Sequence, residues 1–154
     1  ADLLSIKISK SLVAWKNNKS DEAINYLKEL LEESETTYLY ETLTSLLIVN
    51  NKLDDALTII DKGLNYNNTS NVLKSNFAEA NYLLGNYNVA EVKFKELVDS
   101  NVSFMEPYYY LGLILLNNNE NDAALEILKK ATLFNDSLVS LVNCEKIKNL
   151  ITSI

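Results

Sequence analysis

Apolar residues recur every three or four positions within short segments of the chain, and polar corners rich in Asn separate these segments. This spacing predicts amphipathic α-helices, because strands would alternate apolar and polar residues with a period of two. The pattern places paired helices at residues 4–16 and 21–33, 37–50 and 53–66, 71–84 and 87–100, and 105–118 and 121–134. Pro107 lacks a backbone N–H and fits only the first turn of a helix, which agrees with a start at 105.

One pattern of 14 residues occurs four times along the chain. It reads NKSDEAINYLKELL at 18–31, NKLDDALTIIDKGL at 51–64, GNYNVAEVKFKELV at 85–98 and NENDAALEILKKAT at 119–132. The interval of 33 or 34 residues is the length of two short helices and two corners. The sixth place of the pattern is always alanine, namely Ala23, Ala56, Ala90 and Ala124. We expect these alanines where paired helices cross, since a larger side chain there would cost about 1–3 kcal/mol.

The first residue of the pattern marks the corner between two paired helices. Gly85 occupies it in the third copy, and glycine adopts a left-handed backbone conformation most easily. Asn18, Asn51 and Asn119 occupy it in the other copies, and asparagine is the next best residue in that conformation. We therefore expect a left-handed residue at each of these corners.

The order of residues within each unit resembles the tetratricopeptide repeat, in which an aromatic residue, a Leu-Gly pair and small residues stand at set places. The fourth unit matches well, with Tyr108, Leu111-Gly112, Ala124, Leu128 and Ala131. The third unit matches in its second helix, and the first unit barely matches in its first helix. The resemblance implies an all-α fold, a right-handed α-solenoid of antiparallel helix pairs, in a single domain over residues 1–154. It places the repeats at about 4–36, 37–70, 71–104 and 105–138.

Residues 137–154 lack the repeat signature and contain a further apolar stretch. The resemblance implies a capping helix over about 137–152, with Ser137 as its N-cap. The apolar residues of this stretch cover more than one helical face. This pattern indicates that more chain follows in the native protein or that this end contacts another surface.

Composition argues against several classes of function. The net charge is −7, with 14 Lys and no Arg, whereas nucleic-acid binding relies on cationic side chains. The chain contains no His and only one cysteine, so we expect no catalytic centre, no metal site and no cofactor. The uncharged stretch at 107–119 is too short to cross a bilayer, and we expect no membrane insertion.

The single cysteine, Cys144, favours a reducing compartment, and we expect a cytoplasmic protein. The chain begins at Ala1 in place of Met, which indicates an excised piece or a removed leader.

In tetratricopeptide arrays the first helix of each repeat lines a concave groove that holds partner segments, and the resemblance assigns groove residues here. They are Ile8, Leu12, Trp15, Tyr38, Glu41, Ser45, Glu79, Tyr82, Glu106, Tyr109 and Leu113. Apolar and aromatic side chains dominate this set and three carboxylates accompany them. We therefore expect a protein or peptide partner that is apolar or amphipathic and carries Lys or Arg. The aromatic residues are equally suited to packing between neighbouring first helices.

These features favour a non-catalytic protein–protein interaction module, such as an adaptor, a scaffold or a chaperone-like subunit. One alternative is a self-assembling structural subunit, a homo-oligomer formed through its terminal helices. Another is a regulatory segment of a larger enzyme or of a peptide-sensing regulator. The sequence leaves these alternatives open.

Overall fold

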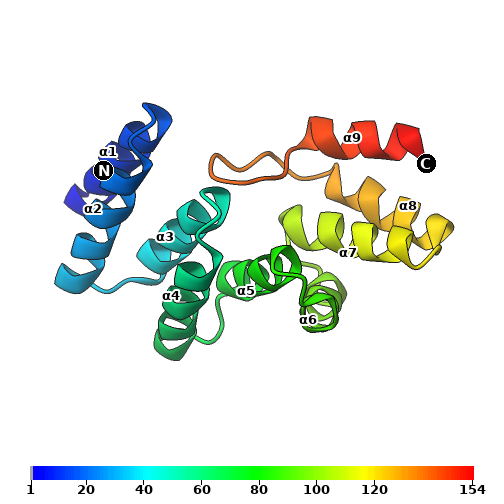
Figure 1. Ribbon diagram of the computed structural model, residues 1–154, viewed down its shortest axis with the longest axis horizontal. Coiled ribbons are helices and arrows are strands. Elements are labelled where there is room, and N and C mark those ends of the chain that lie inside the picture. Colours follow the sequence, from blue (N-terminus) through cyan, green and yellow to red (C-terminus); the bar gives the residue numbers. More distant parts are fainter. Residues whose placement is uncertain (1) are drawn as a thin grey trace. The chain divides into compact units, whose positions relative to one another are not determined.

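A computed structural model describes residues 2–154, which form nine helices and no strand. The helices, shown in Figure 1, are α1 (Leu3–Lys16), α2 (Ser20–Glu33), α3 (Thr37–Val49), α4 (Leu53–Tyr66), α5 (Asn71–Leu83), α6 (Tyr87–Asp99), α7 (Glu106–Asn117), α8 (Asn121–Ala131) and α9 (Cys144–Ser153). Every predicted bound of the first eight helices lies within three residues of the observed one, so the apolar spacing predicted these helices correctly. The expectation about Ala1 lies outside the described residues.

The chain divides into two compact units, unit 1 (Ala1–Leu73) and unit 2 (Lys74–Ile154), with the boundary inside α5. Each unit is described by itself. The expected single domain over residues 1–154 remains a prediction.

Unit 1 contains two antiparallel helix pairs. Helix α1 packs against α2, α3 packs against α4, and α2 also packs against α3. Ala23 and Ala56 are fully buried, as expected where paired helices cross. Gly63 on α4 permits a further close approach, because an added Cβ would lie 2.9 Å from Leu73 Cδ1 and 3.0 Å from the ring of Tyr40. Small residues therefore set the helix spacing in this unit.

Unit 2 repeats this arrangement and adds a final helix. Helix α7 packs against its partner α8 and against the preceding α6, and α8 also packs against α9. Ala90 and Ala124 are fully buried. Gly112 lets α7 approach Leu128 on α8, since an added Cβ would lie 2.5 Å from Leu128 Cδ2. The small residues of the repeat pattern are thus the positions at which helices meet most closely.

The corners between paired helices have the predicted conformation. Their φ angles are positive: 63° at Asn18, 58° at Asn51, 90° at Gly85 and 60° at Asn119. Each corner is closed by a hydrogen bond from the next N–H to a carbonyl five residues back, and this bond measures 2.9 Å at the Asn18 and Asn119 corners. This arrangement is the Schellman motif, which satisfies a carbonyl at the end of the first helix. The prediction is confirmed at all four corners.

The predicted capping helix is wrong at its start, because α9 begins at Cys144 and not near Ser137. Asn143 is the N-cap, and its side chain accepts a hydrogen bond of 2.8 Å from the N–H three residues on. Before it, Ser140 Oγ accepts a hydrogen bond of 3.1 Å from the Val142 N–H. Such local side-chain bonds offer the backbone an alternative to a helix.

Most apolar residues of α9 pack inside unit 2. Ile147 is fully buried, and Leu150 and Ile151 pack against the core of unit 2. The outward positions of α9 are polar, with Glu145 and Lys148 both exposed. Helix α9 therefore covers the last helix pair and presents a polar surface, as a solenoid cap requires. Within residues 2–154, no helix combines the length and apolar character needed to cross a membrane.

Candidate partner-binding surface

The predicted groove residues of unit 1 differ widely in exposure. Ile8 is buried, whereas Tyr38 is 57% exposed. The others are half-buried, namely Leu12, Trp15, Glu41 and Ser45. The predicted groove residues on α1 and α3 therefore range from buried to exposed.

Glu41 has a structural partner within unit 1. Its Oε2 atom accepts a hydrogen bond of 2.6 Å from Ser70 Oγ. The same Ser70 oxygen accepts a bond of 3.1 Å from the Leu73 N–H, which caps the first turn of α5. One oxygen of Glu41 thus orients a helix cap. This oxygen is already hydrogen-bonded within the chain and is less available to a partner.

In unit 2, helices α5 and α7 bring the remaining predicted residues together with one tyrosine that sequence reasoning missed. We call this set the unit 2 wall: Glu79, Tyr82, Glu106, Tyr109, Tyr110 and Leu113. The ring centroids of Tyr82 and Tyr110 lie 5.0 Å apart, and those of Tyr109 and Tyr110 also lie 5.0 Å apart. Tyr82 and Tyr109 therefore pack in an aromatic cluster, as the alternative interpretation of the sequence expects.

Glu79 is a buried carboxyl inside this cluster, with only 5% of its surface exposed. The hydroxyl of Tyr110 donates a hydrogen bond to Glu79 Oε2. Burial raises the pKa of Glu79 to about 7, the Tyr110 hydrogen bond opposes this rise, and the nearby charge of Glu106 adds to it. Burial and the Glu79 carboxylate together raise the pKa of the Tyr110 hydroxyl, so Tyr110 stays a hydrogen-bond donor at neutral pH.

Glu106 is the second buried carboxyl of the wall and stands in the first turn of α7. Its Oε1 atom is buried and has no hydrogen-bond partner. Burial raises the pKa of Glu106 to about 7, its own backbone N–H lowers it, and Asp136 raises it further. A buried acceptor without a donor costs about 1–3 kcal/mol. The wall therefore contains an unsatisfied acidic group.

Lys146 on α9 brings a positive charge to this cluster. Its Nζ atom lies 5.7 Å from the centroid of the Tyr109 ring, which is a cation–π contact. The same ammonium lowers the pKa of Glu79 by charge attraction. The chain itself thus holds a basic side chain against the unit 2 wall.

A pocket of about 620 Å³ adjoins the wall at the end of α7. Tyr82 and Leu113 belong to both the wall and the pocket, and Tyr87, Glu91 and Leu116 line it further. The rings of Tyr82 and Tyr87 meet edge to face with centroids 5.2 Å apart. The volume lies within the range of small-ligand pockets. The lining is mixed, since Asn88, Asn117 and Asn118 accompany the apolar side chains.

Two members of this arrangement were not predictable from the repeat pattern. Tyr110 corresponds to Thr42 in the second repeat and to Asn76 in the third, so the repeat pattern does not predict an aromatic residue at this place. Lys146 lies on α9, beyond the repeats. Among residues 2–154, the acidic and cysteine side chains form no group of three or more that could hold a metal ion.

The tetratricopeptide repeat family model matches residues 4–37 and 106–137, which correspond to the first and fourth predicted repeats. No curated protein matches the chain by sequence.

Several solved structures share the fold. A thermophilic tetratricopeptide repeat protein of Thermus thermophilus has a TM-score of 0.75 and 15% identity, over 97% of this chain and 80% of that one. MamA from Desulfovibrio magneticus RS-1 has a TM-score of 0.66 and 20% identity, over 86% of this chain and 75% of that one. A tetratricopeptide repeat protein of Parabacteroides merdae has a TM-score of 0.65 and 19% identity, over 97% of this chain and 66% of that one. These likenesses confirm the fold class, an α-solenoid of antiparallel helix pairs.

Proposed function

Since the chain carries tetratricopeptide repeats, we propose that it is a non-catalytic protein-interaction module whose unit 2 wall binds a partner segment. The segment is apolar or amphipathic and carries Lys or Arg. The observation that carries this proposal is the position of Lys146, whose ammonium lies 5.7 Å from the Tyr109 ring centroid and stabilises the Glu79 carboxylate. A basic side chain of a partner would meet the same two attractions.

The buried carboxyls supply the reason for a cationic ligand. A guanidinium or ammonium offers several donors and a full charge, and Glu106 Oε1 lacks a donor. Tyrosine faces add a cation–π attraction of about 0.5–2 kcal/mol. Binding would require local rearrangement to admit the cation, because Glu106 Oε1 is buried in the free protein.

The pocket supplies the reason for an apolar ligand. Tyr82, Leu113 and Leu116 present apolar surface on one part of the pocket of about 620 Å³, and polar side chains line the rest. Filling such a pocket with an aliphatic or aromatic side chain removes apolar area from water, which is the main favourable term in association. The wall and the pocket share Tyr82, so one segment with adjacent apolar and basic residues can engage both.

Self-assembly through α9 has less support than partner binding. The apolar residues of α9 pack inside unit 2, and its outward positions include Glu145 and Lys148. The free thiol of Cys144 supports a reducing compartment such as the cytoplasm.

Selection of random dodecapeptides displayed on phage tests the proposal. We expect the intact chain to enrich peptides in which Arg or Lys adjoins an aliphatic or aromatic residue. The Glu79→Gln/Glu106→Gln double variant should lose the enrichment of basic residues and keep that of apolar ones. Glu126→Gln on α8, an exposed carboxylate, is the matched control and should select like the unchanged chain. Enrichment of acidic peptides, or no difference between the variants, would overturn the proposal.

A further inference from the structure

Lys146 reaches the unit 2 wall from another part of the chain. The wall consists of residues of α5 and α7, whereas Lys146 stands in the first turn of α9. Residues 132–143, which are not helical, connect α8 to α9. Helix α9 packs against α8, and this packing sets Lys146 beside the Tyr109 ring of α7.

Three attractions hold the ammonium group of Lys146. Its Nζ atom lies 5.7 Å from the centroid of the Tyr109 ring, and it donates a hydrogen bond of 3.5 Å to the Leu141 carbonyl. Its charge also attracts the Glu79 carboxylate. Among residues 2–154, no carboxylate forms a salt bridge with it. Each attraction is weak, because the hydrogen bond is long and the cation–π contact lies at an exposed site.

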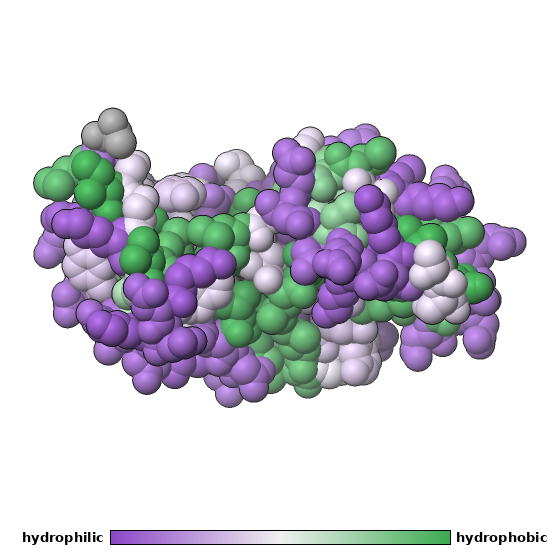
Figure 2. All heavy atoms as spheres, turned by 90° about the horizontal axis from the view of Figure 1, so that it is seen from above, coloured by the Kyte–Doolittle hydropathy of each residue, from purple (hydrophilic) through white to green (hydrophobic). Residues whose placement is uncertain are grey.

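Water reaches this ammonium group although α9 itself is anchored. Lys146 is exposed, whereas the adjacent Ile147 is fully buried in unit 2. Seen from the side on which α9 lies, unit 2 shows many hydrophilic side chains beside smaller hydrophobic areas (Figure 2). A lysine side chain has a flexible stem and a strongly hydrated head. The ammonium can therefore leave the Tyr109 ring for water while the helix stays in place.

We propose that Lys146 is an internal competitor at the unit 2 wall, where its ammonium occupies in the free protein the place that a basic side chain of the partner takes in the complex. This inference rests on the proposed function, since it names what regulates the same site. A Lys or Arg of the partner must displace Lys146 before it reaches Tyr109 and Glu79. The competition lowers the affinity of every basic segment, and segments that bind by charge alone are excluded first.

The partner's cation can still win this competition. Glu106 Oε1 has no hydrogen-bond donor in the free protein, so Lys146 does not satisfy it. A guanidinium carries five donors and can reach more than one acceptor at once. A partner's Arg that donates to Glu106 therefore gains an interaction that Lys146 does not make.

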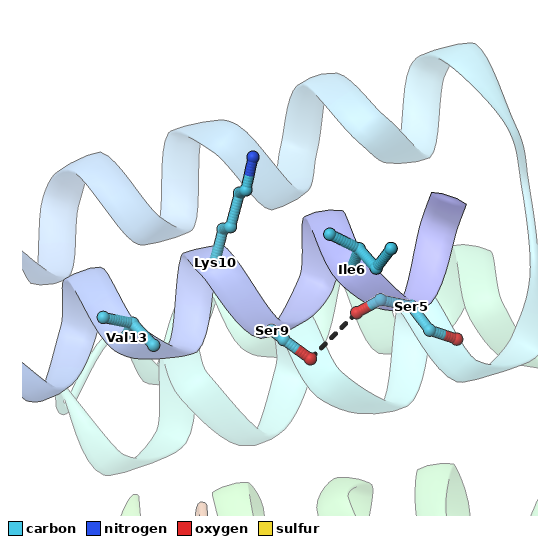
Figure 3. A pocket seen from close by; sticks show the side chains of 5 residues that line it. All are labelled: Ser5, Ile6, Ser9, Lys10 and Val13. Atoms are coloured by element: carbon cyan, nitrogen blue, oxygen red, sulfur yellow. Dashed lines mark hydrogen bonds between the residues drawn. The ribbon is translucent and has the colours of Figure 1, made fainter. Parts of the chain in front are cut away.

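A hollow on α1 provides an internal control within unit 1. Its volume is about 350 Å³, and Figure 3 shows the side chains that line it, namely Ser5, Ile6, Ser9, Lys10 and Val13. This lining includes no carboxylate, so a basic ligand gains no charge attraction from it. The amide signals of residues 3–14 should therefore not distinguish a basic ligand from a neutral one.

The probe is the N-acetylated, C-amidated peptide GLRFG, in which Arg stands between an aliphatic and an aromatic residue. Its twin carries citrulline in place of Arg. Each peptide is titrated into the ¹⁵N-labelled full chain, and amide chemical shifts in NMR give the dissociation constants. We expect Lys146→Met to bind the Arg peptide about threefold more tightly than the unchanged chain does, because the variant lacks the competing cation–π contact. The affinity of the citrulline twin should stay the same.

Two control variants make the test specific. Lys148→Met removes the same charge from another exposed position of α9 and should leave the affinity of the Arg peptide unchanged. Lys146→Arg should bind the Arg peptide like the unchanged chain, since a guanidinium also stacks on an aromatic ring. Circular dichroism checks the folding of each variant.

The side chain of Lys146 itself gives a second readout. With ¹³C-labelled lysine, the ring current of Tyr109 should shift the ε-methylene signal of Lys146 upfield of that of Lys148. The Arg peptide should move the Lys146 signal toward the Lys148 value as it displaces the ammonium. The citrulline twin should leave the signal in place.

The outcomes separate this inference from the proposed function. An equal preference for the Arg peptide in the unchanged chain and in Lys146→Met would overturn the competitor role and leave the proposed function standing, and so would a Lys146 signal that stays in place when the Arg peptide binds. Weaker binding of the Arg peptide to Lys146→Met would mean that Lys146 holds the partner, which also overturns the inference. Equal affinities of the two peptides for both chains, or no binding of either, would overturn the proposed function and the inference with it.

Discussion

The hydroxyl of Tyr110 on α7 donates a hydrogen bond to the carboxylate of Glu79 on α5, although the two residues stand 31 positions apart in the sequence. This bond joins the first helices of two successive repeats inside unit 2. The Tyr110 ring also stacks on Phe94 of α6, with centroids 5.3 Å apart. Tyr110 thus connects the buried acidic group of the wall to the core of the unit.

Replacing Tyr110 with Phe should destabilise the protein in a pH-dependent way. Above pH 7 the variant leaves a buried, ionised Glu79 without its donor, and hydrogen bonds to charged groups contribute about 1.5–3 kcal/mol. At pH 5 Glu79 is protonated, and the expected loss falls to about 1 kcal/mol. Urea unfolding of the variant and the unchanged chain at pH 5 and pH 8 measures both values.

Tyr108→Phe is the matched control for this prediction. The Tyr108 hydroxyl donates a bond of 2.8 Å to the Val102 carbonyl, an acceptor that does not titrate. Its loss should cost about 1 kcal/mol at either pH. An equal loss for Tyr110→Phe at pH 5 and pH 8 would contradict the role assigned to Glu79.

The two buried carboxyls should make stability fall as pH rises through the weakly acidic range. Burial raises the pKa of Glu79 and of Glu106 to about 7, above the ordinary value of 4.5. Each group therefore binds more protons in the folded state between these pH values, and the free energy of unfolding decreases from about pH 4.5 to about pH 7. Glu79→Gln/Glu106→Gln lacks both groups, so its free energy of unfolding should rise by about 5 kcal/mol relative to that of the unchanged chain between pH 4.5 and pH 7.

Urea unfolding at intervals between pH 4.5 and pH 8, followed by circular dichroism, gives these curves. Glu126→Gln removes an exposed carboxylate and should give a curve parallel to that of the unchanged chain. If the double variant were also parallel to the unchanged chain, Glu79 and Glu106 would titrate normally and the wall would contain no buried acid.

Gly112→Ala should destabilise the contact between α7 and α8. The added Cβ would lie 2.5 Å from Leu128 Cδ2 and 2.6 Å from Leu128 Cγ, so the Leu128 side chain or one of the helices must shift. Overpacking of this kind costs about 1–3 kcal/mol. In a Leu128→Ala background the obstacle is gone, and the same substitution should cost at least about 1 kcal/mol less. Additive losses in a double-mutant cycle of thermal or urea unfolding would refute the steric explanation.

Asn119→Ala should cost about 1 kcal/mol, because Asn119 has a φ of 60° and alanine is strained there. Asn119→Gly should be neutral or slightly stabilising. Asn118→Ala is the control, since the adjacent Asn118 has a φ of −88° and should tolerate alanine within about 0.5 kcal/mol. Urea midpoints compare the variants, and equal losses at the two positions would contradict a conformational role for Asn119.

Local chemistry made the helices and corners predictable. Apolar residues at helical spacing, alanine at each crossing and Asn or Gly at each corner act through neighbours in the same hairpin. Those contacts recur at a fixed interval, so the sequence displays them directly. The start of α9 was not predictable in this way, because Ser137 and Asn143 are both good N-cap residues. The structure has Asn143 as the N-cap, and Ser140 and Asp136 accept hydrogen bonds from the backbone N–H groups of Val142 and Cys144.

The candidate site was only partly predictable, for a physical reason. A glutamate on an amphipathic helix normally faces water, and the residues next to Glu79 in the sequence do not indicate burial. The apolar stretch after Glu106 indicates a buried helix but not that the carboxyl itself is buried. Their environment comes from Tyr110, Asp136 and Lys146, which lie in other elements of the unit. The residues of the wall were therefore predicted by their places in the repeat, whereas their burial and charge coupling required the structure.

The most direct test of the proposed function compares the tightest dodecapeptide from the display selection with a twin that carries citrulline for Arg and norleucine for Lys. Both are titrated against the full chain, and their dissociation constants are measured by fluorescence anisotropy. We predict that the neutral twin binds at least tenfold more weakly, and that Glu79→Gln/Glu106→Gln removes most of this difference. Equal affinity of the two peptides for the unchanged chain would show that the wall does not recognise a basic residue.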